Sequence, residues 1–243
     1  MFSKDWLEVI EKVQQAKIRL GCSKTPGSAF FRGHRVSAWS LSPSIFRYAN
    51  GKNHESSLYD NYLTRSGNLI DRSKSSWEIL AEMRHHGVPT RLLDWTTSFA
   101  VALYFALAQG AKNPCIWVLN PFRLSRSATG KPAIYNFGIQ GGYDYLDHFV
   151  RDRTWPFDAP IAMACPWRIA RIEAQQGYFT VHGNDPSPIE EIGKKYVKKI
   201  EIPERAIENA WQFLDLSGIS EFTLFPDLDG LARWLIKKYN FTS

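Results

Sequence analysis

The chain has 243 residues, of which 44% are hydrophobic and 14% aromatic, so it can bury a sizeable core and is not intrinsically disordered. No run approaches the roughly 18 apolar residues of a membrane-spanning helix, and the first residues carry charges throughout. We therefore expect a cytoplasmic protein with neither a membrane span nor a secretory signal. The formal net charge of +6 suits an anionic partner such as nucleic acid or a dinucleotide, and equally a basic surface that maintains solubility. Basic residues cluster at 193–199 and at Arg123, Arg126 and Lys131, in loop-like or edge-like contexts.

The first 70 residues are predicted to form a helix, a strand and a less regular segment. Apolar residues at helical spacing predict a helix from Ser3 to Gly21. The apolar run at 29–35 is predicted to be a short strand whose end presents Arg32. Residues 37–70 mix small polar groups with aromatics, and we expect a turn followed by irregular or helical structure.

Two apolar helices are predicted on either side of the segment 85–98, which reads HHGVPTRLLDWTTS. The Ser-x-x-Glu pattern at Ser75 has the form of a capping box, and the helix that it opens should end at Gly87. Thr97 or Ser98 can cap the next helix, which is apolar on nearly every side and must be buried. The segment is therefore predicted as a polar turn between two helices.

The second half of the chain mixes strands and helices without regular alternation. Residues 121–165 show no sustained period and are interpreted as a helical insertion or a lid over a site. We expect strands at 113–121, 171–183 and 194–203, a short strand or extended segment at 219–228, and helices at 203–218 and 229–239. These elements predict an α+β fold in one domain over residues 1–243, with a mixed or split β-sheet core flanked by helices.

Several familiar kinds of site lack support in the sequence. It contains no P-loop, no Gly-x-Gly-x-x-Gly, no Gly-x-Ser-x-Gly and no His-Glu-x-x-His motif. The three cysteines, Cys22, Cys115 and Cys165, are widely spaced, which fits reduced thiols rather than disulfides or structural zinc. Because His85 and His86 are adjacent, their side chains diverge on a helix, and we expect no metal site.

The segment 85–98 holds more polar side chains than a turn requires. Arg91 and Asp94 could form a salt bridge that pins the loop, or they could hold a ligand. Trp95 would suit stacking on a base or on nicotinamide while helix amides receive phosphate oxygens. His86 could donate to a phosphate or simply bond the last carbonyls of its helix, and Gln176 could place an amide in the site or pair with a neighbouring strand.

Four motifs together resemble the FRG-domain family, named for its Phe-Arg-Gly. They are FFRG at 30–33, HHGVPTRLLDWTTSFAVALYFA at 85–106, RIEAQQGYF at 171–179 and LFPDLDGLA at 224–232. They follow one another in order and span most of the chain. On this resemblance the whole chain is expected to be a single FRG-type domain.

A more remote resemblance concerns the ADP-ribosyltransferases of the Arg-Ser-Glu class. Their sites begin with an aromatic-Arg-Gly strand, continue with a Ser-Thr-Ser strand that leads into VA-x-x-FA, and end with a glutamate. FRG, WTTSFAVALYFA and a late acidic residue are similar to that order. The resemblance implies an ADP-ribosyltransferase-like fold in which Arg32 holds NAD through its phosphates or nicotinamide ribose. It also implies that Thr96, Thr97 and Ser98 orient the ribose and Arg32.

The third element of this resemblance departs from the pattern. Enzymes of the class carry a Glu or Gln two residues before the catalytic Glu, whereas Glu173 precedes Gln175 here. A glutamine cannot act as a general base. Glu221, in a late segment, is therefore the first candidate for the catalytic carboxylate and Glu173 the second; the other interpretation of Glu221 is a surface residue beside the final helix.

The resemblance implies an NAD-dependent ADP-ribosyltransferase that acts on a macromolecule, with RNA and DNA among the candidate acceptors. It would serve as an intracellular toxin or phage-defence effector, with an antitoxin or regulatory protein as a further partner. Two alternatives stay open. One is a non-catalytic nucleotide or nucleic-acid binding module built on Arg91, Asp94 and Trp95, and the other is an NAD glycohydrolase that releases free ADP-ribose.

Overall fold

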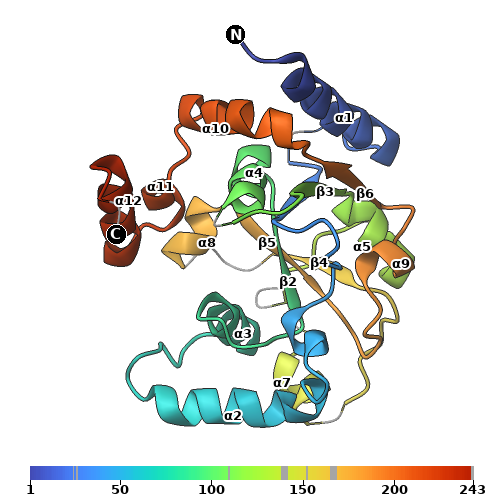
Figure 1. The fold of residues 1–243 in the computed structure, drawn as a ribbon. Coiled ribbons are helices and arrows are strands. Elements are labelled where there is room, and N and C mark those ends of the chain that lie inside the picture. The colour runs from blue at the N-terminus through green and yellow to red at the C-terminus, as the bar shows by residue number, and fades with distance from the viewer. Residues whose placement is uncertain are drawn as a thin grey trace.

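The computed structural model describes residues 1–23, 25, 27–108, 110–137, 142–151, 153–164 and 169–241. Cys165 lies outside this part of the chain. The predicted α+β class is confirmed, because helices flank one six-stranded antiparallel sheet of order β4-β5-β2-β1-β3-β6 (Figure 1). The strands are β1 (Phe30–His34), β2 (Leu92–Thr96), β3 (Cys115–Leu119), β4 (Ile161–Met163), β5 (Gly177–Val181) and β6 (Val197–Glu201).

The sheet is split near its middle. The strands β1 and β3 share five paired positions, and so do β2 and β5. The strands β1 and β2, by contrast, pair at one position, Phe31 with Thr96. Past that pair the two strands are free to diverge, so the sheet consists of a half with β4, β5 and β2 and a half with β1, β3 and β6.

Helices cover both halves of the sheet. The longer ones are α1 (Lys4–Leu20), α2 (Glu55–Ser66), α3 (Ser76–His85), α4 (Phe99–Leu107), α5 (Pro121–Thr129), α10 (Ile207–Leu216) and α12 (Leu228–Lys238). The shorter ones are α7 (Tyr145–Phe149), α8 (Ala170–Ala174), α9 (Ile189–Ile192) and α11 (Glu221–Leu224), with 3-10 turns at Ser44–Arg47, Lys52–His54 and Glu204–Ala206. Among the described residues no helix combines the length and the apolarity needed to cross a bilayer.

Capping explains where the predicted helices begin and end. Ser3 accepts a hydrogen bond from the Trp6 amide, and Gly21 ends α1 in the left-handed conformation. The capping box predicted at Ser75 is present at the start of α3. Ser98 caps α4 by accepting from the Val101 amide. Local hydrogen bonding therefore sets these boundaries.

Two groups of helices pack on different halves of the sheet, and a third core, which includes Phe30 and Trp95, joins the two halves. The helices α1, α4 and α10 pack on one face of β1, β3 and β6, above the sheet in Figure 1. A Cβ atom on Gly33 would lie 1.9 Å from the Ala102 carbonyl oxygen, so only glycine lets β1 and α4 approach this closely. The helices α2, α3 and α7 pack against β2, β4 and β5, below the sheet in Figure 1, around Trp77, Phe179 and Val181.

Three sequence predictions differ from the structure, at 85–98, 219–228 and 171–183. The segment 85–98 is not a simple turn, because Leu92–Thr96 form the central strand β2, which the apolar helices on either side conceal in the sequence. The segment 219–228 contains the helix α11 rather than a strand or an extended segment, because Ser220 and Thr223 form a capping box. In 171–183, α8 occupies the beginning, and the strand β5 begins only at Gly177. The described part of 121–165 contains α5, α7 and β4.

Candidate functional site

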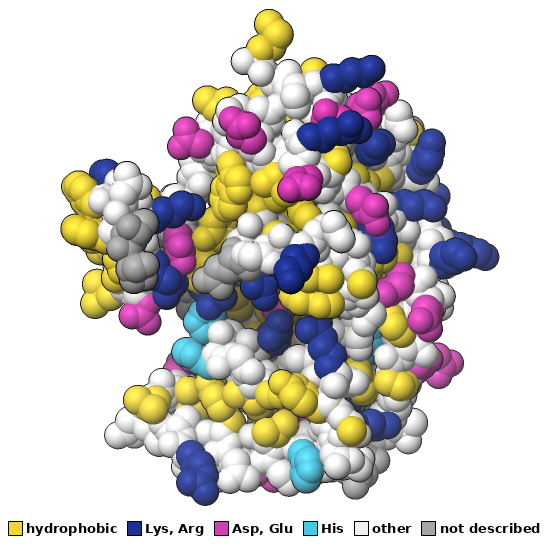
Figure 2. Space-filling view, in the orientation of Figure 1, with side chains coloured by type: hydrophobic (Ala, Val, Ile, Leu, Met, Phe, Trp, Pro, Cys, Tyr) yellow, Lys and Arg dark blue, Asp and Glu magenta, His cyan; other side chains and the backbone are white. Residues whose placement is uncertain are grey.

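A cleft of about 380 Å³ opens where β1 and β2 diverge. Figure 2 shows a hollow at mid-height, with basic side chains (dark blue) gathered in it. The elements around the cleft are β1, β2, α3, α4 and α8, with the segment 35–39 and the 3-10 turn Ser44–Arg47. Its lining residues are Phe31, Arg32, Gly33, His34, Arg35, Trp39, Arg47, Ala81, Arg84, His85, Gly87, Asp94, Trp95, Thr96, Val101, Ala102, Phe105, Arg171, Ile172, Gln175 and Phe179.

The lining carries far more positive than negative charge. Five guanidinium groups, those of Arg32, Arg35, Arg47, Arg84 and Arg171, stand against one carboxylate, that of Asp94. The two lining histidines do not add to this charge at neutral pH. Burial and the nearby guanidinium of Arg171 lower the pKa of His85, so its neutral form is favoured. The cleft is therefore suited to an anion.

Asp94 is the ionic centre of the cleft. Its Oδ2 atom accepts hydrogen bonds from Nε and Nη2 of Arg84, at 3.0 and 2.6 Å. Burial raises the pKa of this carboxyl, but the charges of Arg84 and Arg32 outweigh burial and hold the pKa below its ordinary value. The side chain keeps 42% of its accessible surface, because that surface faces the cleft. Asp94 is thus an ionised carboxylate at the floor of the cleft.

Arg32 crosses the gap between the two halves of the sheet. From β1 its Nη1 atom donates to the backbone oxygen of Asp94 on β2, at 2.7 Å. Its Nε atom donates to Nε2 of His34, at 3.0 Å. Burial, and then the charge of Arg32, lower the pKa of His34 to about 3, so this histidine is a neutral acceptor. Burial likewise lowers the pKa of Arg32 to about 10, which leaves the guanidinium charged at neutral pH.

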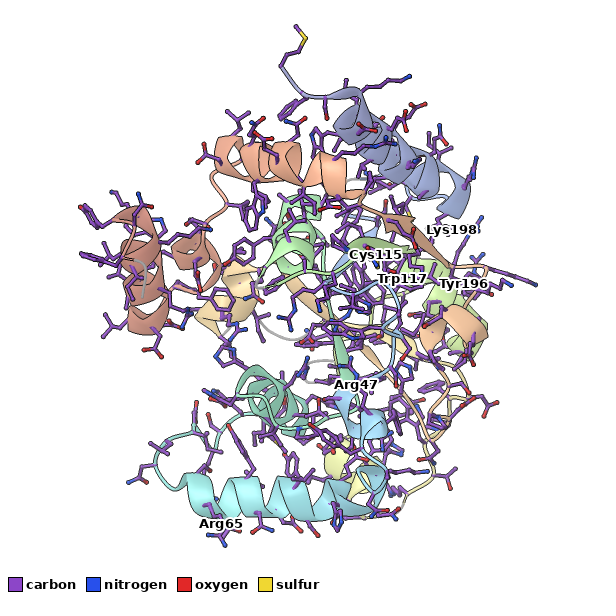
Figure 3. The ribbon with its side chains drawn as sticks, viewed as in Figure 1. Arg47, Arg65, Cys115, Trp117, Tyr196 and Lys198 are labelled. Carbon is purple, nitrogen blue, oxygen red and sulfur yellow. The ribbon has the colours of Figure 1, made fainter. Side chains whose placement is uncertain are left out.

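Two further arginines reach the cleft from its margins. Arg171 on α8 stacks on the ring of Phe225, with 4.4 Å between guanidinium carbon and ring centroid. Arg47, labelled in Figure 3, donates through Nε and Nη2 to the Ser42 carbonyl oxygen, at 3.0 and 2.7 Å. Burial lowers the pKa of both groups, yet both stay charged at neutral pH. The chain thus holds each guanidinium at a defined place.

Arg91, a predicted ligand residue, is buried away from the cleft lining. Its guanidinium forms a two-bond ion pair with Glu55, in which Nε donates to Oε1 at 2.6 Å, and Nη1 also donates to the His182 carbonyl oxygen at 2.8 Å. The hydroxyl of Tyr145 donates to the same carboxylate at 2.8 Å. The predicted salt bridge between Arg91 and Asp94 therefore does not form. In an extended strand, side chains three residues apart point to opposite faces.

Trp95 lines the cleft, but its ring is not offered for stacking. The side chain is buried in the core between β2, β3 and α5. Its Nε1 atom donates to the hydroxyl of Thr180 on β5, at 3.0 Å. The geometry therefore supports a packing role for this ring, and a base or nicotinamide would need another surface.

The three hydroxyls after Trp95 organise the junction between β2, α4 and α8. Thr96 Oγ1 donates to the Gln175 carbonyl oxygen at 2.7 Å and accepts from the Ser98 amide at 3.0 Å. Thr97 Oγ1 donates to the Gln176 side-chain oxygen at 3.2 Å. Of these five residues, Thr96 and Gln175 line the cleft, so Thr97, Ser98 and Gln176 lie beside it.

Neither predicted catalytic glutamate is among the described residues that line the cleft. Glu221 accepts a hydrogen bond from Nε of Arg233 at 2.6 Å, beside the C-terminal helix. Glu173 is exposed on α8. His86 ends α3, and its ring contacts that of His85 rather than lining the cleft. The structure brings Arg32, Asp94 and Thr96 together and leaves the two glutamates outside.

Sequence reasoning missed most of the cations in the cleft. Arg171 begins the motif RIEAQQGYF, and Arg84 directly precedes the motif that starts at His85, so proximity to these motifs was the available signal. Arg47 lies in a segment with no recognisable pattern. Within the described part of the chain, no group of three or more His, Cys, Asp or Glu residues could hold a metal ion.

Comparison with protein-family models gives one match. Residues 27–114 match the FRG domain, so the chain carries an FRG domain that includes β1, α2, α3, β2 and α4. Comparisons with curated proteins and with solved structures find no match. Arg32, Arg84 and Asp94 all lie within the matched stretch, whereas Arg171 lies beyond it.

Proposed function

We propose that this FRG-domain protein binds a nucleotide through its phosphate groups in the cleft between β1 and β2, and that the nucleotide is NAD. The observation that carries the proposal is the excess of five guanidinium groups over one carboxylate in a cleft of about 380 Å³. Guanidinium groups bind phosphate oxygens with two parallel hydrogen bonds. A cleft of this size also lies within the range of ligand sites, about 300–1,000 Å³.

The ion pairs of the cleft support this proposal. Asp94 holds Arg84 in place, and Arg32 is held by the Asp94 backbone and by His34. Two cations on opposite halves of the sheet are thus oriented before any ligand arrives, which lowers the entropic cost of binding. The apolar lining residues Phe105 and Phe179 add a surface for a base or for nicotinamide.

The chemistry that we propose is transfer of ADP-ribose from NAD, with Asp94 in the role that the sequence suggested for Glu221 or Glu173. The bond between ribose and nicotinamide breaks, nicotinamide leaves with the electron pair, and the ionised Asp94 stabilises the positive charge on the ribose. A nucleophilic oxygen or nitrogen of RNA, DNA or protein then bonds to the ribose and loses its proton to solvent. Water in place of that nucleophile gives free ADP-ribose.

A second candidate is a nucleotide-binding module without catalysis. The observation that favours it is that Oδ2 of Asp94 is shared by Arg84 and Arg32, as in a carboxylate that only positions cations. The two candidates differ in one property, the release of nicotinamide.

Calorimetric titration with NAD, together with an assay of nicotinamide release, tests the proposal. We expect wild type to bind NAD and release nicotinamide, and Asp94→Asn to lose about a hundredfold or more of the release rate. Glu221→Gln is the matched control, a carboxylate-to-amide change outside the cleft, and should leave both readouts unchanged. Absence of NAD binding by wild type contradicts the whole proposal, and binding without release favours the module.

The acceptor is found by incubating the protein with total RNA, DNA and protein and with NAD labelled on its adenylate phosphate. Transfer of label to one class identifies the acceptor, and free labelled ADP-ribose identifies hydrolysis. Growth arrest on expression of wild type, relieved by Asp94→Asn, is the result expected of an intracellular toxin or defence effector. Growth arrest that persists in Asp94→Asn contradicts a catalytic origin of that effect.

A further inference from the structure

A second groove lies on another part of the molecule, between α1 and the edge strand β6. It has a volume of about 430 Å³ and is lined on the α1 side by Lys12 and Arg19 and on the β6 side by Lys198 and Lys199. Glu201 is the acidic residue in its lining. None of these side chains belongs to the cleft described above.

The fold joins basic residues that are far apart in the sequence along this groove. Asn120, the N-cap of α5, donates through Nδ2 to the Leu20 carbonyl oxygen at 2.7 Å and through its amide to the Tyr196 carbonyl oxygen at 2.8 Å. The end of α1, the start of α5 and the start of β6 therefore meet at one place. Arg123 packs against Gly21 there, with Nη2 3.5 Å from the position of a Cβ atom.

We name this surface the basic edge and define it by Lys12, Arg19, Arg123, Lys194, Lys195 and Lys198. All six side chains are exposed. Figure 2 shows Lys and Arg side chains along the right margin of the molecule, over α1 and β6, and Figure 3 shows Lys198 pointing outward there. The two basic clusters noted in the sequence, at 193–199 and around Arg123, thus contribute to one surface.

The simplest alternative explanation for these basic residues is that they protect an edge strand from pairing with another chain. Lysines on an exposed strand prevent pairing with another chain, and this accounts for Lys198 and Lys199. It does not account for Arg19 and Arg123, which lie on helices whose backbone is already paired. Lys12, on α1, pairs with Glu8 one turn away, at 3.8 Å. The continuity of charge across three elements therefore needs a further reason.

We infer that the basic edge binds the phosphate backbone of a single-stranded nucleic acid. A row of exposed lysines and arginines along an open groove matches a chain of phosphates, which such residues bind with release of counterions. A membrane surface fits less well, because α1 exposes only two separated apolar residues, Leu7 and Ile18, among the exposed large hydrophobics of the described chain. More of these residues, such as Leu228, Ile236 and Phe241, lie near the C-terminus, outside this groove. The inference is independent of NAD binding in the cleft.

The experiment compares two double variants with equal change of charge. Arg19→Glu with Lys198→Glu alters the basic edge, and Lys52→Glu with Arg65→Glu alters the region of α2 on the far side of the molecule, where Arg65 is labelled in Figure 3. All four side chains are exposed, and Arg19 and Arg65 both lie in the last turn of a helix. Binding of a fluorescent single-stranded RNA of about 20 nucleotides is measured by anisotropy over a range of salt concentrations.

We expect the basic-edge variant to bind at least about tenfold more weakly than wild type, and the slope of log K against log salt to shrink by about 1.4 if two phosphate contacts are lost. The control variant should match wild type in both. Failure of wild type to bind RNA at low salt, or equal loss in the two variants, overturns the inference. Stronger binding to polyglutamate or to anionic lipid vesicles overturns it as well. Because RNA binding is read without NAD, failure of the cleft proposal leaves this result unaffected.

Discussion

Two ion-pair networks only a few residues apart in the sequence serve different ends. In the closed network, Arg91 and Glu55 pair with side chains 2% and 5% exposed, and Tyr145 and the His182 carbonyl satisfy the remaining atoms. In the open network, Asp94 lies between Arg84 and Arg32 and keeps 42% of its surface facing the cleft. A network in which every charge is satisfied stabilises the fold, whereas one with surplus cations leaves charge for a ligand.

The largest expected effect is loss of stability in the closed network. Arg91→Ala leaves Glu55 buried and unpaired, and we expect the free energy of unfolding to fall by about 3–5 kcal/mol. Urea denaturation followed by circular dichroism measures the loss. Arg91→Lys keeps the charge without the two-pronged geometry and should lie between alanine and wild type. Wild-type stability in Arg91→Ala would show that the closed network is not structural.

Acid should weaken both networks, because each contains a neutral buried histidine. Burial and the neighbouring arginine lower the pKa of His34 and of His182 to about 3, against an ordinary 6.5. As pH falls below 6.5, these two histidines take up protons in the unfolded chain but stay neutral in the native state, so the native state becomes less stable. From this difference in proton binding, each histidine is expected to lower the free energy of unfolding by about 2 kcal/mol at pH 5.

His182→Leu separates the contribution of the closed network. Both ring nitrogens of His182 lack a hydrogen-bond partner within the described structure, so leucine removes the titration without breaking a bond. Stability is compared between pH 7 and pH 5 by urea denaturation. We expect the variant to lose about 2 kcal/mol less than wild type over this range. An identical loss in both proteins would place the acid sensitivity elsewhere.

The smallest expected effect on stability comes from the open network. Arg84→Ala removes a cation from a surplus, so we expect a smaller loss of stability than in Arg91→Ala. Binding of NAD should weaken by at least about tenfold, since a hydrogen bond to a charged group contributes about 1.5–3 kcal/mol. Calorimetry gives the affinity and urea denaturation the stability. If Arg84→Ala is less stable than Arg91→Ala and binds NAD as tightly as wild type, the roles assigned to the open and closed networks are contradicted.

Features set by residues close together in the sequence, such as helix ends, could be predicted. Features set by the pairing of distant strands could not. The hydrogen bonds of Ser3 and Ser75 are local, so the boundaries of α1 and α3 could be read from the sequence. The strand β2 is recognisable only through its pairing with β5, which lies about 85 residues later in the chain. Arg84 and Arg171 reach one cleft for the same reason, because that pairing places α3 and α8 on either side of it.

The single pair between Phe31 and Thr96 has a mechanical consequence. In a continuous sheet, rotation of one half against the other would break a ladder of backbone hydrogen bonds. Here one backbone pair joins the halves, and rotation is resisted instead by side chains packed across the junction, such as Phe30 and Trp95. The aperture of the cleft is therefore governed by side chains, including Arg32, which reaches the Asp94 backbone across the gap. An anion that forms hydrogen bonds to Arg32 and Arg84 together would link the two halves of the sheet. The bound ligand would therefore reduce their movement relative to each other.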